Sequence, residues 1–181
     1  MAKARQRCWR AAWVLDLDIK SFFDSIDHEL LLCAVRKHTR ENWVVLYIKR
    51  WLTAPVERSD GRIQARDRGT PQGGVISPLL ANLYLHYAFD LWMVRNFPTV
   101  LFARYADDVI CPCRSARQAR YLRDRLARRM AHCRLRLHPQ KTKIVYCASS
   151  NRRHAYPVTS FDFLGYTFLR CTICCGRLMS G

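Results

Sequence analysis

The alternation of apolar and polar positions near the start of the chain predicts a strand over residues 13–19. With the two-residue repeat of a strand, Val14, Asp16 and Asp18 lie on one face. The other face is entirely apolar. We therefore expect one face to be buried and the other to present carboxylates.

Several longer segments repeat their apolar residues at helical spacing instead. Asp27 has the side chain and position of an N-cap, so a helix is expected to begin at His28. The segment 115–133 carries an apolar stripe and many arginines on its other faces. The stripes predict helices beginning at residue 28 and spanning residues 42–52, 78–97 and 115–133.

The predicted helix over residues 78–97 is the longest of these. Its helical repeat selects one face for the core, made of Leu80, Leu83, Tyr84, Tyr87 and Leu91.

Short apolar runs separated by turn residues predict further strands and hairpins. Ser59–Arg62 is a turn signal between two short extended pieces, and residues 69–74 form a loop. Further strands are expected at 101–104, 109–112, 143–148 and 160–168. Antiparallel hairpins mixed with helices indicate the α+β class, and no internal domain boundary is apparent.

The net charge of the chain says more about its binding partners than its length does. The 181 residues carry a net charge of +17, with a pI of about 10.1, which favours a polyanionic partner and nucleic acid first. No apolar run is long enough to span a membrane, and the first ten residues lack the features of a secretory signal. We therefore expect a cytoplasmic protein whose nine cysteines form no disulfide framework.

Carboxylates occur at two separate strand ends. Asp18 ends the first strand, and Asp107 and Asp108 occupy the turn between the strands 101–104 and 109–112. Adjacent carboxylates repel each other unless they face solvent or bind a cation. An all-oxygen site of three such groups suits Mg²⁺, although an Asp-Asp pair is also common in ordinary polar turns.

Five segments, in this order, resemble the conserved motifs of reverse transcriptases. The Gly-Thr-Pro-Gln-Gly-Gly run resembles the group II intron-encoded branch of bacterial reverse transcriptases most closely, although retron-type and CRISPR-associated enzymes share much of the set. The five segments are residues 18–24, 69–82, 105–108, 137–143 and 161–166.

This resemblance implies an RNA-directed DNA polymerase with a palm fold, an antiparallel sheet with helices packed on one face. It implies two Mg²⁺ ions, an RNA template (intron RNA), a DNA primer and dNTPs. Asp18, Asp107 and Asp108 would be the catalytic metal ligands, whereas Asp16 is more consistent with a solvated or indirectly acting carboxylate.

The resemblance also implies two groups of substrate contacts. Phe23 matches the aromatic gate that excludes a 2′-hydroxyl, the alternative being a core phenylalanine. Lys141 matches a lysine that protonates or neutralises the departing pyrophosphate, the alternative being a general phosphate contact or a surface lysine. The implied nucleotide contacts are Phe23, Gln72, Gly73 and Lys141, and the implied primer grip is Phe163, Leu164, Gly165 and Tyr166.

The motifs divide the chain into a basic segment 1–12, a palm domain 13–168 and an atypical Cys-rich tail 169–181. Relative to the family, the fingers are mostly missing and the thumb is absent. The resemblance therefore implies a truncated chain that is weakly active or inactive alone.

Rival interpretations come from other palm enzymes and from proteins that only bind RNA. An RNA-dependent RNA polymerase would favour a polar gate residue and a glycine before the Asp pair, where this chain has Phe23 and Ala106. A palm-type cyclase would need a Gly-Gly-Asp turn. A non-catalytic RNA-binding remnant of an intron maturase stays open, because it needs only the charge.

Overall fold

A computed structural model describes residues 11–57, 61–71, 73–147 and 158–168 of the chain. These residues form two compact units. The first unit contains the described residues up to Asp18, residues 99–124 and those from 139 onward. The second contains residues 19–98 and 125–138.

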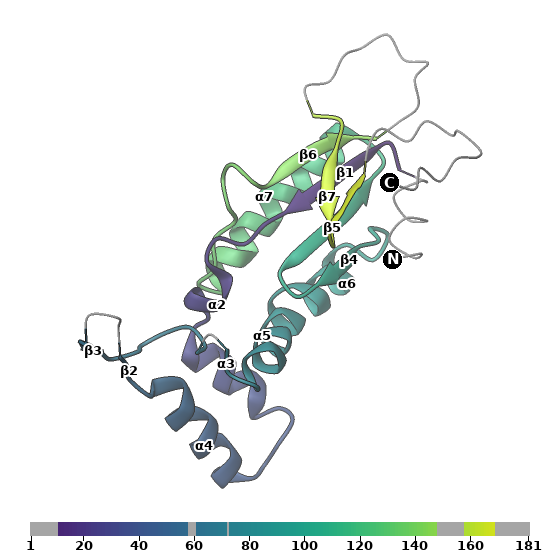
Figure 1. Cartoon of the computed structure of the whole chain (residues 1–181). Coiled ribbons are helices and arrows are strands. Elements are labelled where there is room, and N and C mark those ends of the chain that lie inside the picture. Colours follow the sequence, from purple (N-terminus) through teal and green to yellow (C-terminus); the bar gives the residue numbers. More distant parts are fainter. Residues whose placement is uncertain (1–10, 58–60, 72, 148–157, 169–181) are drawn as a thin grey trace. The chain divides into compact units, whose positions relative to one another are not determined.

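The first unit is built on an antiparallel sheet of four strands in the order β4-β5-β1-β6 (Figure 1). A separate two-stranded hairpin, β7–β8, follows it in the chain. The strands are β1 Trp13–Leu17, β4 Ala103–Tyr105, β5 Asp108–Cys113, β6 Lys143–Tyr146, β7 Phe161–Phe163 and β8 Tyr166–Phe168.

The predicted strand at 160–168 is therefore a hairpin. Its chain reverses at Leu164 and Gly165, which both have positive φ, 55° and 75°. Two successive residues with positive φ give the twist that a tight antiparallel turn needs.

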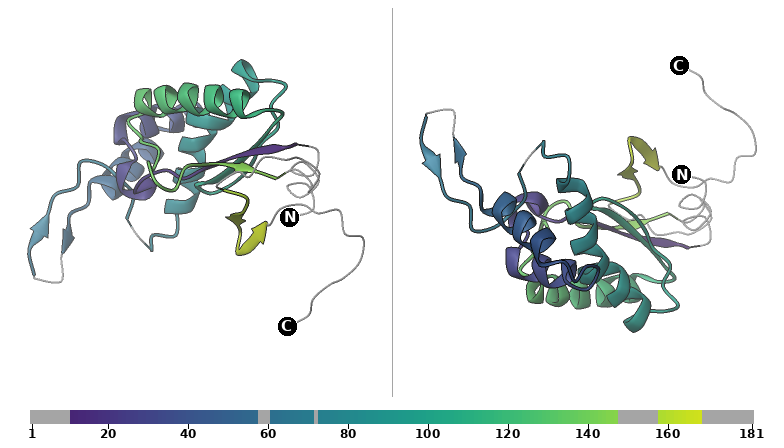
Figure 2. Two further views of the ribbon diagram at one scale, coloured as in Figure 1. Left: turned by 90° about the horizontal axis from the view of Figure 1, so that it is seen from above. Right: turned by 90° about the horizontal axis from the view of Figure 1, so that it is seen from below.

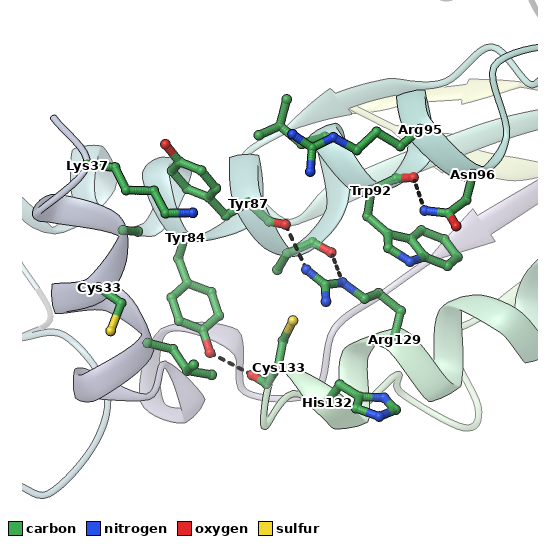
Figure 3. A pocket seen from close by; sticks show the side chains of 14 residues that line it. Cys33, Lys37, Tyr84, Tyr87, Trp92, Arg95, Asn96, Arg129, His132 and Cys133 are labelled. Carbon is green, nitrogen blue, oxygen red and sulfur yellow. Dashed lines mark hydrogen bonds between the residues drawn. The ribbon is translucent and has the colours of Figure 1, made fainter.

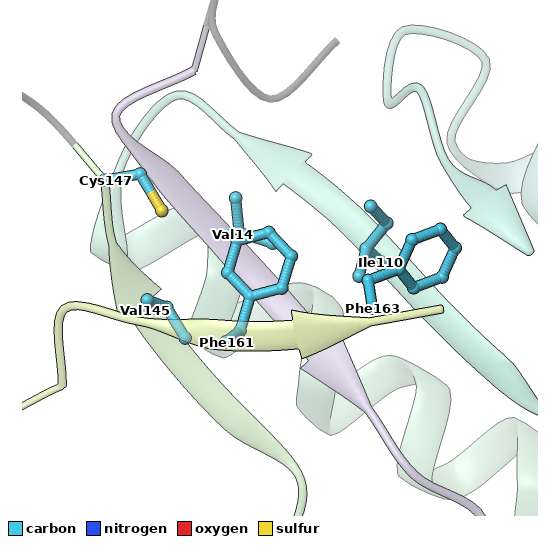
Figure 4. Packing of buried hydrophobic residues seen from close by; sticks show 6 residues of the cluster. All are labelled: Val14, Ile110, Val145, Cys147, Phe161 and Phe163. Atoms are coloured by element: carbon cyan, nitrogen blue, oxygen red, sulfur yellow. The ribbon is translucent and has the colours of Figure 1, made fainter. Parts of the chain in front are cut away.

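The face of β1 that carries the aspartates is more covered than its alternation predicted. Val14 is fully buried and packs with Ile110, Val145, Phe161 and Phe163 in one apolar cluster (Figure 4). The two phenylalanines belong to β7, so a distant hairpin covers this face. The expectation that only the opposite face is buried was wrong, because alternation cannot show what a later segment covers.

The second unit is mainly helical, with one small hairpin, β2–β3, which can be followed in both views of Figure 2. The turn of that hairpin, predicted at residues 59–62, lies partly outside the described residues. The elements are α2 Phe22–Ser25, α3 His28–Val35, α4 Asn42–Thr53, β2 Val56–Glu57, β3 Ile63–Gln64, α5 Ser77–Leu85, η1 His86–Asp90 and α6 Leu91–Asn96.

The predicted start of α3 is confirmed. The Asp27 side chain accepts a hydrogen bond from the backbone N–H of Leu30 at 2.9 Å, which satisfies one of the free donors of the first turn. Arg134 forms an ion pair with the same carboxylate. The N-cap is thus tied to Arg134, more than 100 residues later in the chain.

The predicted helix 78–97 is interrupted by a π-helical turn, η1, between α5 and α6. The wider turn advances the register, so that Phe89 and Met93 are fully buried. Tyr87 and Leu91, predicted as core residues, are only half-buried. A regular repeat of 3.6 residues could not show this change of face.

Helix α7 Ala116–His132 begins in the first unit and ends in the second. Its predicted apolar stripe is confirmed, because Ala119, Leu122, Leu126 and Met130 are all buried. The described helices and strands confirm the α+β class. None of the described helices has the length and apolar character needed to cross a membrane.

Candidate active site

The register of the first unit brings two of the predicted acids together. Strand β1 pairs antiparallel with β5, with Asp16 opposite Ile110 and Leu17 opposite Val109. One further step of this register places Asp18 opposite Asp108. Residues ninety positions apart in the sequence thus meet at one end of the sheet.

The turn between β4 and β5, which carries Asp107, is stabilised by hydrogen bonds to its backbone. Tyr105 pairs with Asp108 across the β4–β5 hairpin, and Ala106 between them has a φ of 51°. Arg104 Nη1 donates a hydrogen bond to the Ala106 carbonyl at 2.9 Å. This bond stabilises the left-handed residue directly before Asp107.

A cavity of about 360 Å³ lies at this end of the sheet, and we call its charged lining the carboxylate site. The lining mixes acids from three segments with two lysines from a fourth. The charged residues are Asp16, Asp18, Asp108, Asp162, Lys141 and Lys143.

The backbone of Asp18 is fixed by the segment that carries Lys141. The Asp18 N–H donates to Thr142 Oγ1 at 3.4 Å, and that hydroxyl donates to the Asp18 carbonyl oxygen at 3.3 Å. Lys141 Nζ lies 3.8 Å from Asp18 Oδ2. Because the ammonium is 66% exposed, this pair contributes little to stability but leaves a mobile cation beside the carboxylate.

Two carboxyl groups of the carboxylate site, those of Asp108 and Asp16, have raised pKa values. Burial, and then the charges of Asp107 and Asp18, raise the pKa of Asp108. Burial raises the pKa of Asp16 to about 7, and the charge of Asp108 adds to this while Lys143 opposes it. Near neutral pH the site therefore holds fewer negative charges than its carboxyl groups would allow.

The donors fit a hard cation in their chemistry. They are carboxylate oxygens, the ligands that Mg²⁺ prefers. A nearby positive charge would relieve the repulsion of Asp108 by Asp107 and Asp18, which adds to burial in raising the pKa of Asp108. Within the described part of the chain, no three or more His, Cys, Asp or Glu side chains are already gathered closely enough to hold a metal ion. Binding would therefore require these side chains to turn toward the ion.

The β7–β8 hairpin, predicted as the primer grip, supplies both apolar and polar groups. Phe163 is buried, whereas Tyr166 at the turn is exposed. Between them Leu164 is half-buried and Gly165 is exposed. The turn of the hairpin, with Gly165 and Tyr166, is therefore accessible.

Asp162 on β7 was not singled out from the sequence. It lines the carboxylate site and accepts a 2.6 Å hydrogen bond from Thr167 Oγ1. Its charge also contributes to the raised pKa of Asp16. Its place in the alternating Phe-Asp-Phe run could have indicated that it points away from the two buried phenylalanines.

Two of the predicted nucleotide contacts lie in the second unit, and Gln72 lies outside the described residues. Phe23 on α2 is half-buried, and its ring centre lies 5.3 Å from that of Phe22, which is buried in the core. Gly73 has a φ of 77° and open space around it, so its backbone angle, and not a lack of space, favours glycine there.

Gly69, whose role was not predicted, locks the loop containing Gly73 to α2. Its N–H donates to the Ile26 carbonyl at 2.7 Å, and the Thr70 N–H donates to the Phe23 carbonyl at 2.8 Å. A Cβ at Gly69 would lie 2.9 Å from Asp24 Cα, and the φ of 80° also disfavours any other residue. Gly69 and Thr70 are thus tied to the segment that carries Phe23.

Comparisons with known proteins were consistent with this geometry. A family model described as "Reverse transcriptase (RNA-dependent DNA polymerase)" matches residues 2–168. Protein YkfC of Escherichia coli K12 is 29% identical over 194 aligned residues, covering 89% of this chain and 48% of YkfC. The group II intron-encoded protein LtrA of Lactococcus lactis subsp. cremoris is 38% identical over 76 residues, covering 42% of this chain and 12% of LtrA.

Among solved structures, the apo telomerase of Candida tropicalis truncated from its C-terminal domain has a TM-score of 0.69 with 13% identity. The match covers 96% of this chain and 38% of that one, and at this identity it shows the fold alone. The present chain spans less than half the length of the curated relatives named above.

Proposed function

Because this chain belongs to the reverse transcriptase family, we propose that it is the catalytic part of an RNA-directed DNA polymerase of the group II intron-encoded type. The observation that carries the proposal is the β1–β5 register, which brings Asp18 and Asp108 into one cavity with Lys141. The substrates would be an RNA template, a DNA primer and dNTPs. The resemblance to the intron-encoded protein LtrA supports intron RNA as the template.

Reverse transcriptases generally use Mg²⁺. We propose that Asp18, Asp107 and Asp108 hold two ions, which would activate the primer 3′-hydroxyl and stabilise the pyrophosphate leaving group. Lys141, 3.8 Å from Asp18, is positioned to release that carboxylate and contact a triphosphate instead. Asp16, whose pKa burial raises to about 7, would adjust the charge of the site rather than bind an ion.

We further propose that Phe23 discriminates between dNTPs and rNTPs. Its ring contacts the ring of Phe22, and the hydrogen bond from the Thr70 N–H to the Phe23 carbonyl fixes the backbone of Phe23. An aromatic ring at this position would clash with a 2′-hydroxyl and so favour dNTPs. Gln72 and Gly73 would complete the nucleotide contact, and the β7–β8 turn would hold the primer end.

Primer extension tests the proposal directly. Chain 1–181 is given poly(rA)–oligo(dT), dTTP and Mg²⁺ and compared with the Asp107→Ala/Asp108→Ala variant. An Asp67→Ala/Asp124→Ala variant is the matched control, since it removes two exposed carboxylates elsewhere. Extension by the wild type and the control, but not by the first variant, supports the proposal.

Metal binding provides a second readout, which does not require turnover. Fe²⁺ in place of Mg²⁺ generates hydroxyl radicals that cleave the backbone beside a bound ion, and cuts are expected at residues 18 and 107–108. Extension that survives the Asp107→Ala/Asp108→Ala change would refute the assigned site. Salt-sensitive RNA binding without extension and without these cuts would instead favour a non-catalytic RNA-binding remnant.

A further inference from the structure

A second cavity, of about 430 Å³, lies in the second unit among α3, α5, η1, α6 and α7 (Figure 3). Its volume is within the range of small-ligand sites, roughly 300–1,000 Å³. We call it the basic aromatic pocket, after six of its lining residues: Lys37, Tyr87, Trp92, Arg95, Arg129 and His132. It shares no residue with the carboxylate site.

The pocket is positively charged without compensation. None of its lining residues is an aspartate or glutamate. Lys37 and Arg95 are exposed and form no ion pair with any described residue. Like charges brought together in this way repel each other, and an anionic ligand would relieve the repulsion.

Two aromatic rings stand beside these cations and are held in place. The Tyr87 hydroxyl is hydrogen-bonded to His38 Nε2 at 3.0 Å, and Lys37 Nζ lies 4.6 Å from the centre of the Tyr87 ring. The Trp92 ring packs against Phe97 at 5.3 Å. The Tyr87 ring also has edge contacts with His38 and His86, at 5.9 and 5.3 Å between ring centres, and both Tyr87 and Trp92 are only half-buried.

The π-helical turn gives the pocket a fixed wall. Arg129 Nε donates to the Ala88 carbonyl and Nη2 to the Tyr87 carbonyl, each at 2.9 Å (Figure 3). These bonds cross 41 and 42 residues of sequence and tie η1 to α7. Single π-turns inside α-helices occur frequently at functional sites.

We propose that the basic aromatic pocket binds a nucleotide of single-stranded RNA. Lys37 and Arg95 would contact its phosphates, and a base would stack on Tyr87 or Trp92. An acidic peptide is the rival ligand, and it would satisfy the charges but leave the rings without a planar partner. In its ligand, RNA, this proposal rests on the proposed polymerase function. The residues of the pocket and the experiment that tests them are separate from those of the carboxylate site.

Cys33 offers a local reporter of occupancy, because it lines the pocket and is an exposed free thiol. Chain 1–181 is treated with N-ethylmaleimide, and the alkylation rate of the Cys33 peptide is followed by mass spectrometry. The ligand is a mixed-sequence single-stranded RNA of about 12 nucleotides. We expect alkylation of Cys33 to slow about tenfold at an RNA concentration about ten times the Kd.

Two double variants with the same loss of charge separate the pocket from the general basic surface. Lys37→Ala/Arg95→Ala should weaken the RNA affinity obtained from Cys33 protection about tenfold. Arg117→Ala/Arg120→Ala removes two exposed arginines of α7 outside the pocket. This variant should change the same RNA affinity less than about twofold. Equal weakening by both variants would overturn the proposal.

Ligand comparisons with the wild-type chain do not depend on the folding of any variant. Protection by polyglutamate but not by single-stranded RNA would make the pocket a site for acidic protein and overturn the proposal. Equal protection by duplex RNA of the same length would also overturn it, because paired bases cannot stack on the rings. The Asp107→Ala/Asp108→Ala variant should retain full protection, so this result is independent of polymerase activity.

Discussion

The carboxylate site and the basic aromatic pocket are opposite in charge and in construction. The first gathers four aspartates and two lysines at the end of a sheet, where β1, β5, β7 and the segment before β6 converge. The second contains cations and aromatic rings, without any acid, among helices. The net charge of +17 is thus unevenly distributed over the chain.

This difference shows how each site balances its own electrostatics. In the carboxylate site, repulsion is relieved by protonation of Asp16 and by the lysines, and a bound cation would relieve it further. In the basic aromatic pocket, the guanidinium of Arg129 is satisfied by backbone carbonyls, while Lys37 and Arg95 are left to a ligand. One site is therefore suited to cations and the other to anions.

The largest effect expected is on catalysis. Asp18→Asn keeps the size of the side chain but removes a charged ligand, and primer extension should fall about a thousandfold, or about 4 kcal/mol in barrier. RNA protection of Cys33 should not change in the same protein. Loss of both signals together would show that the two sites are not independent.

The next effect concerns the pH dependence of the free energy of unfolding, measured by urea unfolding without divalent ions. The pKa of Asp16, near 4 in the unfolded chain, is raised to about 7 on folding, so the folded state binds its proton more tightly. Stability should therefore be lost as the pH rises from 4 to 7. Asp16→Asn should remove this loss and stabilise the protein at pH 8 by up to about 3 kcal/mol, allowing for solvent screening.

The matched control for this measurement is Asp124→Asn, which changes an exposed carboxylate of α7 paired with Arg123. It should leave the pH profile unchanged. If Asp16→Asn leaves the slope between pH 4 and 7 intact, burial of Asp16 is not the source of the pH dependence.

A smaller effect is expected at the wall of the pocket. Arg129→Met keeps the aliphatic stem but leaves the Tyr87 and Ala88 carbonyls without their charged donor, which should cost about 2 kcal/mol of unfolding free energy. Arg128→Met, at an exposed position one residue away, should cost less than about 0.5 kcal/mol. Similar costs for both variants would argue against a structural role for the bridge to η1.

The smallest effect is on the salt dependence of RNA binding. Lys37→Ala removes one proposed phosphate contact, so the slope of log K against log salt should decrease in magnitude by about one unit or slightly less. Fluorescence anisotropy over a salt series measures this slope. An unchanged slope would mean that Lys37 makes no phosphate contact.

Local features of the chain were predictable from the sequence. The buried stripe of α7 and the Asp27 N-cap of α3 depend on neighbours within one or two turns, and both were confirmed. The position of Asp18 at the end of β1 and of Asp107 and Asp108 at a hairpin turn also followed from alternation and turn signals. The family was indicated by the order of five short motifs, and the match over residues 2–168 confirmed it.

Other features were decided only by contacts between distant segments. No residue close to Asp16 in the sequence indicates that Asp162 lines the carboxylate site with it, or that Phe161 and Phe163 cover Val14. The π-turn and its bonds to Arg129 depend on packing between segments about 41 residues apart.

The sequence by itself thus determined which side chains share a face of a strand or helix, because that depends on backbone geometry alone. The tertiary structure decided what covers each face, and therefore the pKa of Asp16 and the uncompensated charge of the basic aromatic pocket. The physical reason is that burial and charge interactions depend on distance in space, which a local repeat does not specify.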